Sequence, residues 1–307
     1  MPTYIGTVAS SPTTAYSLFD LTYMIAREMG TLEEGIATGG ITTAIYDTNE
    51  RTEQNDYWNG GSVWLLYDAG GGGAAPQGQY GYVSDFATTG GVITLRSALS
   101  IAPAAGDRYA IATKLVPLSQ LISAVNSSIF ALGPVPLTDI TSITTADEQT
   151  EYSLPAPASH DLREVWIQND NTDSNDNLWT IIRGWYMQHN ATVGGVGTLI
   201  LPYQPTSGYK LKLVYVDHHP NMYDYDDQLA EAIPIELIVY LGVVHCTNTL
   251  WRKTRRPEYQ QDMARYEGLA ALMRRDRPIK MPQRHVNAIN LHNWSTDTSG
   301  PNKVHLG

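Results

Sequence analysis

Residues 234–253 of this chain read PIELIVYLGVVHCTNTLWRK, and this stretch decides the fold that the sequence predicts. Its apolar side chains recur at helical spacing, at Ile235, Ile238, Val239, Leu241 and Val243. A helix that is apolar nearly all round should be buried on more than one side, so we expect this helix to be part of a helical bundle.

The single cysteine, Cys246, lies inside this predicted helix. One cysteine excludes an intrachain disulfide, which fits assembly in the cytosol. In an apolar helix we interpret Cys246 as an inert core thiol rather than a nucleophile.

Predicted helices flank this stretch on both sides. Downstream, Pro257 begins a helix that ends near Arg277, where two further prolines stop regular structure. Upstream, residues 223–233 read YDYDDQLAEAI, and their aspartates predict a capped helix that Pro234 breaks or restarts. Residues 223–277 are therefore predicted to form a helical domain.

Two more helices are predicted nearer the N-terminus. The first covers residues 15–29 with one apolar stripe, takes Thr13 or Thr14 as its N-cap, and belongs to an N-terminal helix and arm over 1–41. The second is a divider helix within 117–134, and the GPVPLTD that ends it and follows it is interpreted as a stiff connector.

Two β-rich regions, over 42–116 and 135–222, consist of short apolar runs separated by turn residues. The predicted strands are GSVWLLYDA, GVITLRSAL and DRYAIATKL in the first region, and SITT, EYSLP, REVWIQND, LWTIIRGWYMQHN, GTLILPY and YKLKLVYV in the second. Short strands with regular turns favour a sandwich or barrel. The predicted fold class is α+β: one or two antiparallel β-sandwich- or barrel-like domains, a C-terminal α-helical bundle and an extended basic tail over 278–307.

Charge is distributed unevenly along the chain. The net charge is -11, yet residues 251–284 hold ten Lys and Arg residues against four Asp and Glu residues. This asymmetry predicts that the C-terminal end meets an acidic partner surface. We find no secretion signal and no apolar run of the roughly 18 residues that a membrane-spanning helix needs.

No stretch carries a recognised catalytic or metal-binding signature. Residues 216–227, VDHHPNMYDYDD, are the best metal candidate, but adjacent histidines of an extended chain point in different directions. We interpret them as a strand-to-helix turn with capping aspartates. Gly70–Gly73 lacks the Gly-Lys-Ser/Thr of a phosphate loop and is interpreted as a flexible hairpin tip. The sequence therefore predicts no catalytic residue, no metal and no cofactor.

The order of these segments resembles a known class of proteins. LFDLTYMIAREMG is followed by DYWNGGSVWLLYD, GDRYAIAT, LISAVNSSIFALGPV, TEYSLP and YDDQLAEAIPIELIVYLGVVHCTNTLWRKT. This organisation resembles virion structural proteins of tailed bacteriophages, and residues 223–284 are similar to head-to-tail connector (adaptor) proteins. In that family an Ile-Pro-containing helix is followed by a long helix and a basic extended tail. The two β-rich regions depart from the smallest, all-helical adaptors, which leaves a tail-side role open.

The resemblance implies a structural protein without enzymatic activity, located in the neck or tail region of the virion and assembled in the host cytoplasm. It implies a homo-oligomeric ring of about twelve copies that joins the portal protein to the tail or nozzle proteins. DNA would pass through this ring with transient contact, and no membrane would be involved.

The resemblance also gives the basic tail a role as a docking arm. A segment with no core of its own is ordered by a partner or stays disordered, and its prolines reduce the entropy lost on docking. HVNAINL would add a strand to a neighbouring sheet edge. The residues expected to bind acidic portal side chains are Arg274, Arg275, Arg277, Lys280 and Arg284.

Two alternatives stay open at the level of sequence. A tail-associated receptor- or carbohydrate-binding protein would use Trp166, Trp179 and Trp185 as a sugar platform, although aromatic residues in strands are more often core. A glycan-cleaving enzyme would need two carboxylates that meet only in the folded chain, and no pair stands out.

Overall fold

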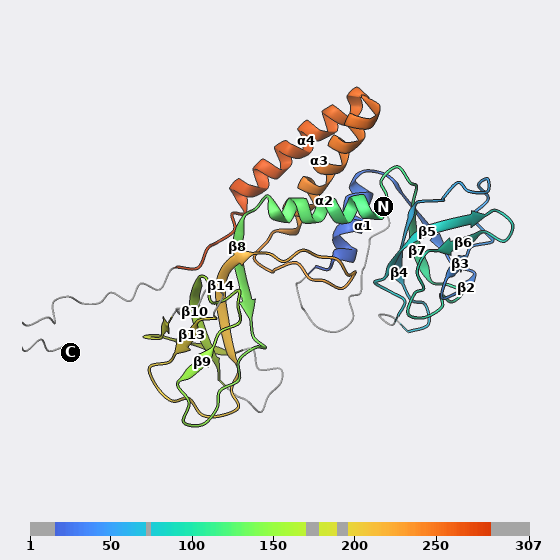
Figure 1. The fold of residues 1–307 in the computed structure, drawn as a ribbon. Helices are drawn as coiled ribbons and strands as arrows, with labels where there is room; N and C mark the ends of the chain where they lie inside the picture. Colours follow the sequence, from blue (N-terminus) through green and yellow to red (C-terminus); the bar gives the residue numbers. More distant parts are fainter. Residues whose placement is uncertain (1–15, 72–74, 170–177, 189–195, 284–307) are drawn as a thin grey trace, which may run out of the picture. The chain divides into compact units, whose positions relative to one another are not determined.

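The computed structural model describes residues 16–71, 75–169, 178–188 and 196–283 (Figure 1). The chain divides into two compact units. The first comprises the chain up to Val135 together with His218–Lys280, and the second comprises Pro136–Asp217 and the chain from Met281 onward. Over the described residues the fold is α+β, with mostly antiparallel sheets and four helices, two of which are C-terminal.

Helix α1 (Leu18–Glu28) begins at a capping box. The N–H of Asp20 donates to Ser17 Oγ at 3.3 Å, and the N–H of Ser17 donates to Asp20 Oδ2 at 2.9 Å. This reciprocal pair satisfies two of the N–H groups that a helix start leaves unpaired. The predicted N-cap at Thr13 or Thr14 is therefore wrong, and both of those residues lie outside the described residues.

Two further N–H groups at the start of α1 are satisfied by a distant part of the chain. Leu18 donates to the carbonyl of Asp227 at 2.8 Å, and Phe19 donates to the carbonyl of Tyr225 at 3.1 Å. The irregular segment before α3 thus lies along the beginning of α1 and completes its hydrogen bonding.

That segment, over 223–233, forms no helix, so the capped helix predicted there is wrong. The carboxylate of Asp227 accepts from the N–H groups of Tyr223 and Asp224 at 2.6 and 2.9 Å, which closes a turn. The helix begins only after Pro234, whose ring fits the start of a helix but not its interior.

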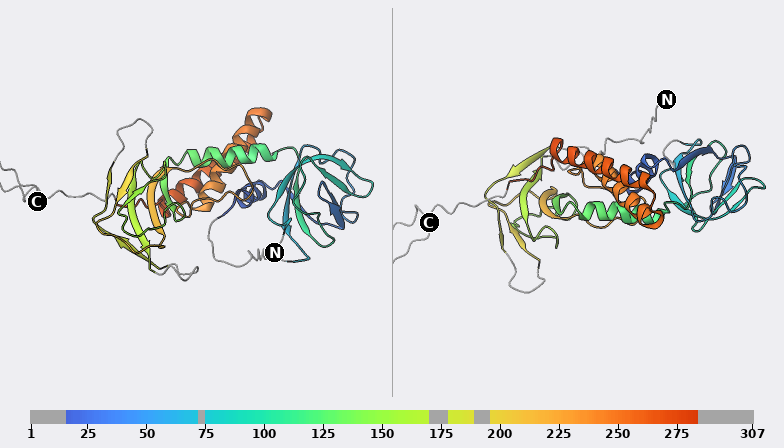
Figure 2. Two further views of the ribbon diagram at one scale, coloured as in Figure 1. Left: turned by 60° about the horizontal axis from the view of Figure 1, so that its bottom comes forward. Right: turned by 90° about the horizontal axis from the view of Figure 1, so that it is seen from above.

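Helices α2 (Leu118–Phe130), α3 (Ile235–Thr254) and α4 (Pro257–Asp276) complete the helical layer of the first unit (Figures 1 and 2). Helix α3 packs against α1, α2 and α4, which explains why its sequence is apolar nearly all round. At Gly242 an added Cβ would lie 2.3 Å from Ile25 Cδ1, so the close approach of α1 to α3 there requires glycine.

One seven-stranded sheet lies beside α1 in the first unit (Figure 1). Its strands, in spatial order, are β1 (Leu32–Ile36), β7 (Arg108–Ala112), β4 (Ser62–Tyr67), β5 (Tyr80–Ala87), β6 (Val92–Leu95), β3 (Ala44–Tyr46) and β2 (Gly39–Ile41). Neighbouring strands pair antiparallel, and β1 and β2 are open edges rather than the seam of a closed barrel. The sequence predicts β4, β6 and β7; the other four strands were not predicted.

Strand β4 is buried on both faces, as its continuous apolar run suggests. Val63 and Leu65 face the apolar core of the sheet. Trp64 faces α1, and its indole N–H donates to Thr22 Oγ1 at 3.1 Å. This strand therefore ties the sheet to the helical layer.

A buried polar network also holds the sheet together. Arg51 Nε donates to the hydroxyl of Tyr109 at 2.8 Å, and that hydroxyl donates to Asp47 Oδ2 at 2.6 Å. Arg51 also donates to Glu33 Oε2 and to the carbonyl of Glu34, both at 2.9 Å. Arg51 and Asp47 are only 4% and 0% exposed, so both charges depend on these partners.

The second unit contains two small sheets that share one apolar core. The four-stranded sheet has the order β11 (Trp179–Ile182), β10 (Leu162–Gln168), β14 (Leu211–His218) and β8 (Pro134–Asp139). The three-stranded sheet has the order β12 (Tyr186–Gln188), β13 (Thr198–Ile200) and β9 (Glu151–Ser153). Leu211 and Leu213 of the first sheet meet Tyr152 and Leu199 of the second in this core.

Two local predictions in this region are corrected. GPVPLTD, interpreted as a stiff connector, is largely a strand, because β8 lies beside β14 in the four-stranded sheet. SITT is not a strand; only an isolated bridge joins Thr144 to Lys210. Of the hairpin tip predicted at Gly70–Gly73, Gly72 and Gly73 lie outside the described residues.

None of the helices within the described ranges combines the length and the apolar character needed to cross a membrane.

Candidate functional site

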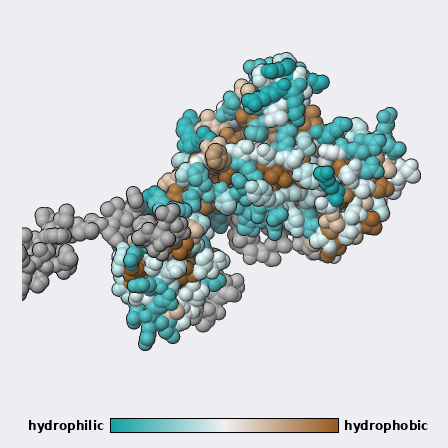
Figure 3. Space-filling view, in the orientation of Figure 1, coloured by the Kyte–Doolittle hydropathy of each residue, from teal (hydrophilic) through white to brown (hydrophobic). Residues whose placement is uncertain are grey.

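The two C-terminal helices form a hairpin whose far end is strongly basic. Arg255 ends α3 in the left-handed conformation, with φ 56°, and Arg256 is the N-cap of α4. We call Trp251–Arg256 the hairpin end. It carries Arg252, Lys253, Arg255 and Arg256, all exposed, and Figure 3 shows hydrophilic residues covering the tip of the hairpin.

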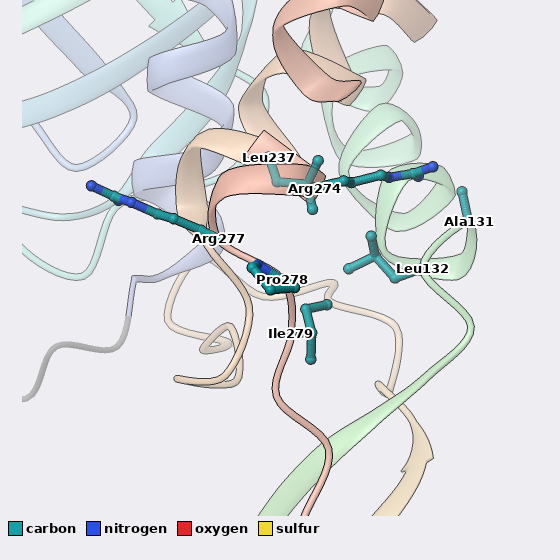
Figure 4. A pocket seen from close by; sticks show the side chains of 7 residues that line it. All are labelled: Ala131, Leu132, Leu237, Arg274, Arg277, Pro278 and Ile279. Carbon is teal, nitrogen blue, oxygen red and sulfur yellow. The ribbon is translucent and has the colours of Figure 1, made fainter. Parts of the chain in front are cut away.

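The basic segment that follows α4 is seated on the first unit where it begins. Ile279 lines a shallow pocket of about 280 Å³ together with Leu132 and Leu237 (Figure 4). Arg277 forms an ion pair with Glu236, with 3.0 Å between Nη1 and Oε1. The first residues after the last helix are therefore ordered by their own chain.

Four of the five residues predicted to bind a partner lie in the described part of the chain, at the end of α4 and in the segment that follows it. Arg274 and Arg277 line the pocket from the end of α4 and extend in opposite directions (Figure 4). Arg275 pairs with its neighbour Asp276 at 2.8 Å, and Lys280 is exposed. Arg284 lies outside the described residues, as does the HVNAINL segment.

The histidine and aspartate cluster at 216–227 is used within the fold. His218 stacks on Phe130 with ring centroids 6.0 Å apart. His219 Nε2 accepts from the N–H of Ala230 at 3.1 Å. Among the described residues, no group of three or more His, Cys, Asp and Glu side chains has the geometry to hold a metal ion.

The fold separates Trp185 from the other two tryptophans of the proposed sugar platform. Trp185 is buried in the apolar core of the second unit. Trp166 and Trp179 are half-buried on the other face of the four-stranded sheet, and Lys212 Nζ lies 6.0 and 5.9 Å from their ring centroids. The two rings therefore hold an ammonium group between them.

Cys246 lies fully buried in α3, in agreement with its interpretation as a core residue. Burial raises the pKa of the Cys246 thiol to about 12, although a hydrogen bond with Gln120 acts in the opposite direction. A thiol that stays protonated at neutral pH is a poor nucleophile.

A second surface of the first unit was missed by sequence reasoning. We call Tyr16, Tyr223, Asp224, Tyr225 and Asp226 the Tyr/Asp surface; all five are exposed, and Tyr223 reaches 67%. Tyr80 fixes this surface to β5, because its hydroxyl donates to the carbonyl of Tyr223 at 3.2 Å and its ring packs edge-on against Tyr225. The YDYDD run was the available signal, but we interpreted it as helix capping.

Burial raises the pKa of Tyr80, and the nearby Tyr82 and the carboxylates of Asp224, Asp227 and Asp226 raise it further. The carboxylates therefore give the Tyr/Asp surface a negative electrostatic potential. Comparison with known proteins assigns no role to any of these residues, because no protein-family model and no curated protein matches the chain.

Proposed function

We propose that this protein is a structural head-to-tail connector of a tailed bacteriophage, located in the neck of the virion. Copies of the chain form a ring that joins the portal protein to the tail and leaves a passage for DNA. The two β regions act as sandwich- or barrel-like modules on this ring, and the extended basic tail acts as the docking arm.

The observation that carries the proposal is where the positive charge lies. Half of the Lys and Arg residues of an acidic chain fall within 251–284, on the hairpin of α3 and α4 and on the segment that follows it. These cations are mostly exposed, and clustered exposed charge of one sign favours association with a surface of the opposite sign. This distribution of charge favours an assembly in which the basic end of each copy contacts an acidic surface of a neighbouring protein.

The position of the arm's root defines how the arm should be tested. Ile279 and the ion pair between Arg277 and Glu236 belong to the body of the first unit, so a truncation that removes them would disturb the body as well as the arm. We therefore compare the full chain with a chain that ends at Gln283.

Negative-stain imaging of the full chain is expected to show annular particles, and particles of the same phage that lack this protein should take it up. The chain ending at Gln283 should keep its circular dichroism spectrum and lose uptake. A full chain that stays monomeric and is not taken up would contradict the connector function.

Uptake of the truncated chain at the level of the full chain would contradict only the role of the arm. Lys280→Glu tests the arm without truncation, because this exposed residue follows the seated root. The change should leave folding unaffected and weaken uptake, since Lys280 is one of the residues expected to bind acidic portal side chains.

A second candidate function rests on Trp166 and Trp179. Two half-buried aromatic rings on one sheet face, with the ammonium of Lys212 between them, suit a tail-associated protein that binds an acidic carbohydrate. Binding to an array of acidic glycans that is lost in Trp179→Ala, and kept in the exposed control Tyr203→Ala, would favour this function over the connector.

A further inference from the structure

The hairpin end presents four exposed cations. Within the described ranges of the chain, Arg252, Lys253, Arg255 and Arg256 take part in no ion pair. Arg255 lies over the ring of Trp251, with its guanidinium carbon 4.6 Å from the ring centroid, which orients this side chain at the tip. Helix α4 buries only two of its side chains, Tyr266 and Ala270, so most of the helix surface is exposed.

The Tyr/Asp surface has complementary chemistry. Tyr16, Tyr223 and Tyr225 are 41%, 67% and 38% exposed. In sequence, Asp224 lies between Tyr223 and Tyr225, and Asp226 follows Tyr225. Tyrosine and aspartate are good partners for arginine, because the guanidinium stacks on aromatic rings and pairs with carboxylates.

These two surfaces belong to the same unit but lie at different ends of it. In Figure 1 the tip of the hairpin stands on one side of α2, and the segment between β14 and α3 that carries the Tyr/Asp surface runs on the other side. They cannot contact each other within this folded unit. A contact between unlike surfaces of identical chains is head-to-tail and closes into a ring when the rotation between copies permits.

We propose that the hairpin end of one copy binds the Tyr/Asp surface of the next copy. This inference rests on the proposed ring and names the two surfaces that would build it. In this contact the arginines of the hairpin end pair with Asp224 and Asp226, and Tyr223 packs against their guanidinium groups.

A second copy fits these observations better than nucleic acid does. The whole chain carries a net charge of -11, which opposes non-specific binding to a phosphate backbone. Nucleic acid on the hairpin end would also leave the exposed tyrosines of the Tyr/Asp surface uncovered. A neighbouring copy satisfies both surfaces at once.

The test uses two charge-reversal variants of the full chain. The hairpin variant is Arg252→Glu with Arg256→Glu, and the surface variant is Asp224→Lys with Asp226→Lys. Both avoid Arg255, which has a left-handed backbone, and Asp227, which closes a turn. The matched control is Arg96→Glu with Lys114→Glu, two exposed cations outside both surfaces.

Self-association is measured by analytical ultracentrifugation over a range of concentrations, at low and high salt. The wild type should associate, and each variant alone should associate about tenfold or more weakly, because like charges then face each other. An equimolar mixture of the two variants should associate again, because the reversed charges of one match the surfaces of the other. A purely structural defect would not be repaired by mixing.

The outcomes separate this inference from the proposed function. If the wild type associates and neither reversal weakens it, the two surfaces are wrong and the ring is built by others. If the wild type stays monomeric at every concentration and yields no rings on particles, the ring and this contact are both overturned. If the hairpin variant loses binding to a short DNA duplex but associates normally, the hairpin end is a nucleic-acid contact and the inference is overturned.

Discussion

The two β regions of this protein are stabilised by different physical means. The seven-stranded sheet encloses apolar side chains but also buries the network of Asp47, Arg51 and Tyr109. The core of the second unit, around Leu211 and Leu213, is formed by apolar and aromatic residues. A buried charge stabilises the fold only while each of its hydrogen-bonding and ion-pair partners is present. Apolar contacts stabilise the fold independently of charge.

This difference predicts which changes should lower the stability of each β region. Burial lowers the pKa of the Arg51 guanidinium, but hydrogen bonds and charges from Tyr109, Glu33 and Glu53 raise it by more, so the group stays charged. The seven-stranded sheet should therefore respond to charge removal and to pH. The second unit should respond mainly to lost volume.

The largest effect is expected from Arg51→Met. It removes the cation and leaves the buried carboxylate of Asp47 without its charged partner, which should lower the free energy of unfolding by about 3–5 kcal/mol. Urea unfolding followed by tryptophan fluorescence measures this. Arg108→Met is the control, because its pair with Glu34 is exposed on both sides and should contribute no more than about 1 kcal/mol. Equal effects of both variants would mean that the buried network stabilises the seven-stranded sheet no more than an exposed ion pair does.

Leu211→Ala is the corresponding change in the second unit. The side chain is fully buried, so the cavity and the lost burial should lower the free energy of unfolding by about 2–5 kcal/mol. Calorimetry at several pH values should give the same loss throughout, since no charge is involved. A loss of stability that varies with pH would show that charged groups contribute to this core. A matching loss in the exposed control Lys210→Ala would show that the loss does not come from buried volume.

Tyr109→Phe sharpens the comparison by removing one hydroxyl from the network. The buried partners Arg51 and Asp47 each lose a hydrogen bond, so the expected loss is about 1–3 kcal/mol at neutral pH. Tyr215→Phe is a matched control, because this half-buried tyrosine lies in the second unit.

The same variant should change the alkaline behaviour of the protein. Burial raises the pKa of Tyr109 above its ordinary value of 10.0, and the hydrogen bond to Asp47 raises it further. A raised folded-state pKa gives stability that is complete below pH about 10 and is lost as the pH rises above it. The free energy of unfolding of the wild type should fall in this range more steeply than that of Tyr109→Phe. Parallel curves for the two proteins would contradict this assignment.

The smallest effect is expected from Thr22→Val, which tests the link between the sheet and α1. The change keeps the shape of the side chain and removes the acceptor of the indole N–H of Trp64, at a cost of about 1 kcal/mol. Chemical denaturation with Thr254→Val as the control measures it, because Thr254 also bonds to its own helix but is exposed. No loss relative to that control would mean that this hydrogen bond contributes nothing to the junction.

The helices could be predicted from sequence, and part of the first sheet could not. Helices α2, α3 and α4 have long periodic patterns and proline or glycine at their ends. Strands β1, β2 and β3 are short, and β1 and β2 contain glycine, which weakens the strand pattern. Gly35 is nevertheless required in β1, because an added Cβ would lie 2.6 Å from the hydroxyl oxygen of Tyr109.

The candidate site was predictable in composition but not in detail. The excess of basic residues after Trp251 can be read from the sequence, and the helical hairpin that displays it follows from two periodic stretches. The pairing of Arg277 with Glu236 joins residues 41 positions apart, so no local pattern indicates it. The same holds for Tyr80, which fixes Tyr223 from 143 positions away.

The path of the chain between the units has a consequence for how such a protein changes over time. The chain leaves the first unit near Val135 and returns at His218, and the strands on either side of this departure and return, β8 and β14, are neighbours in one sheet. The second unit is thus an insertion whose two ends meet, an arrangement that tolerates exchange of the inserted part. The inserted unit could be exchanged for another domain at these two neighbouring junctions, while the helices and the seven-stranded sheet keep their sequence.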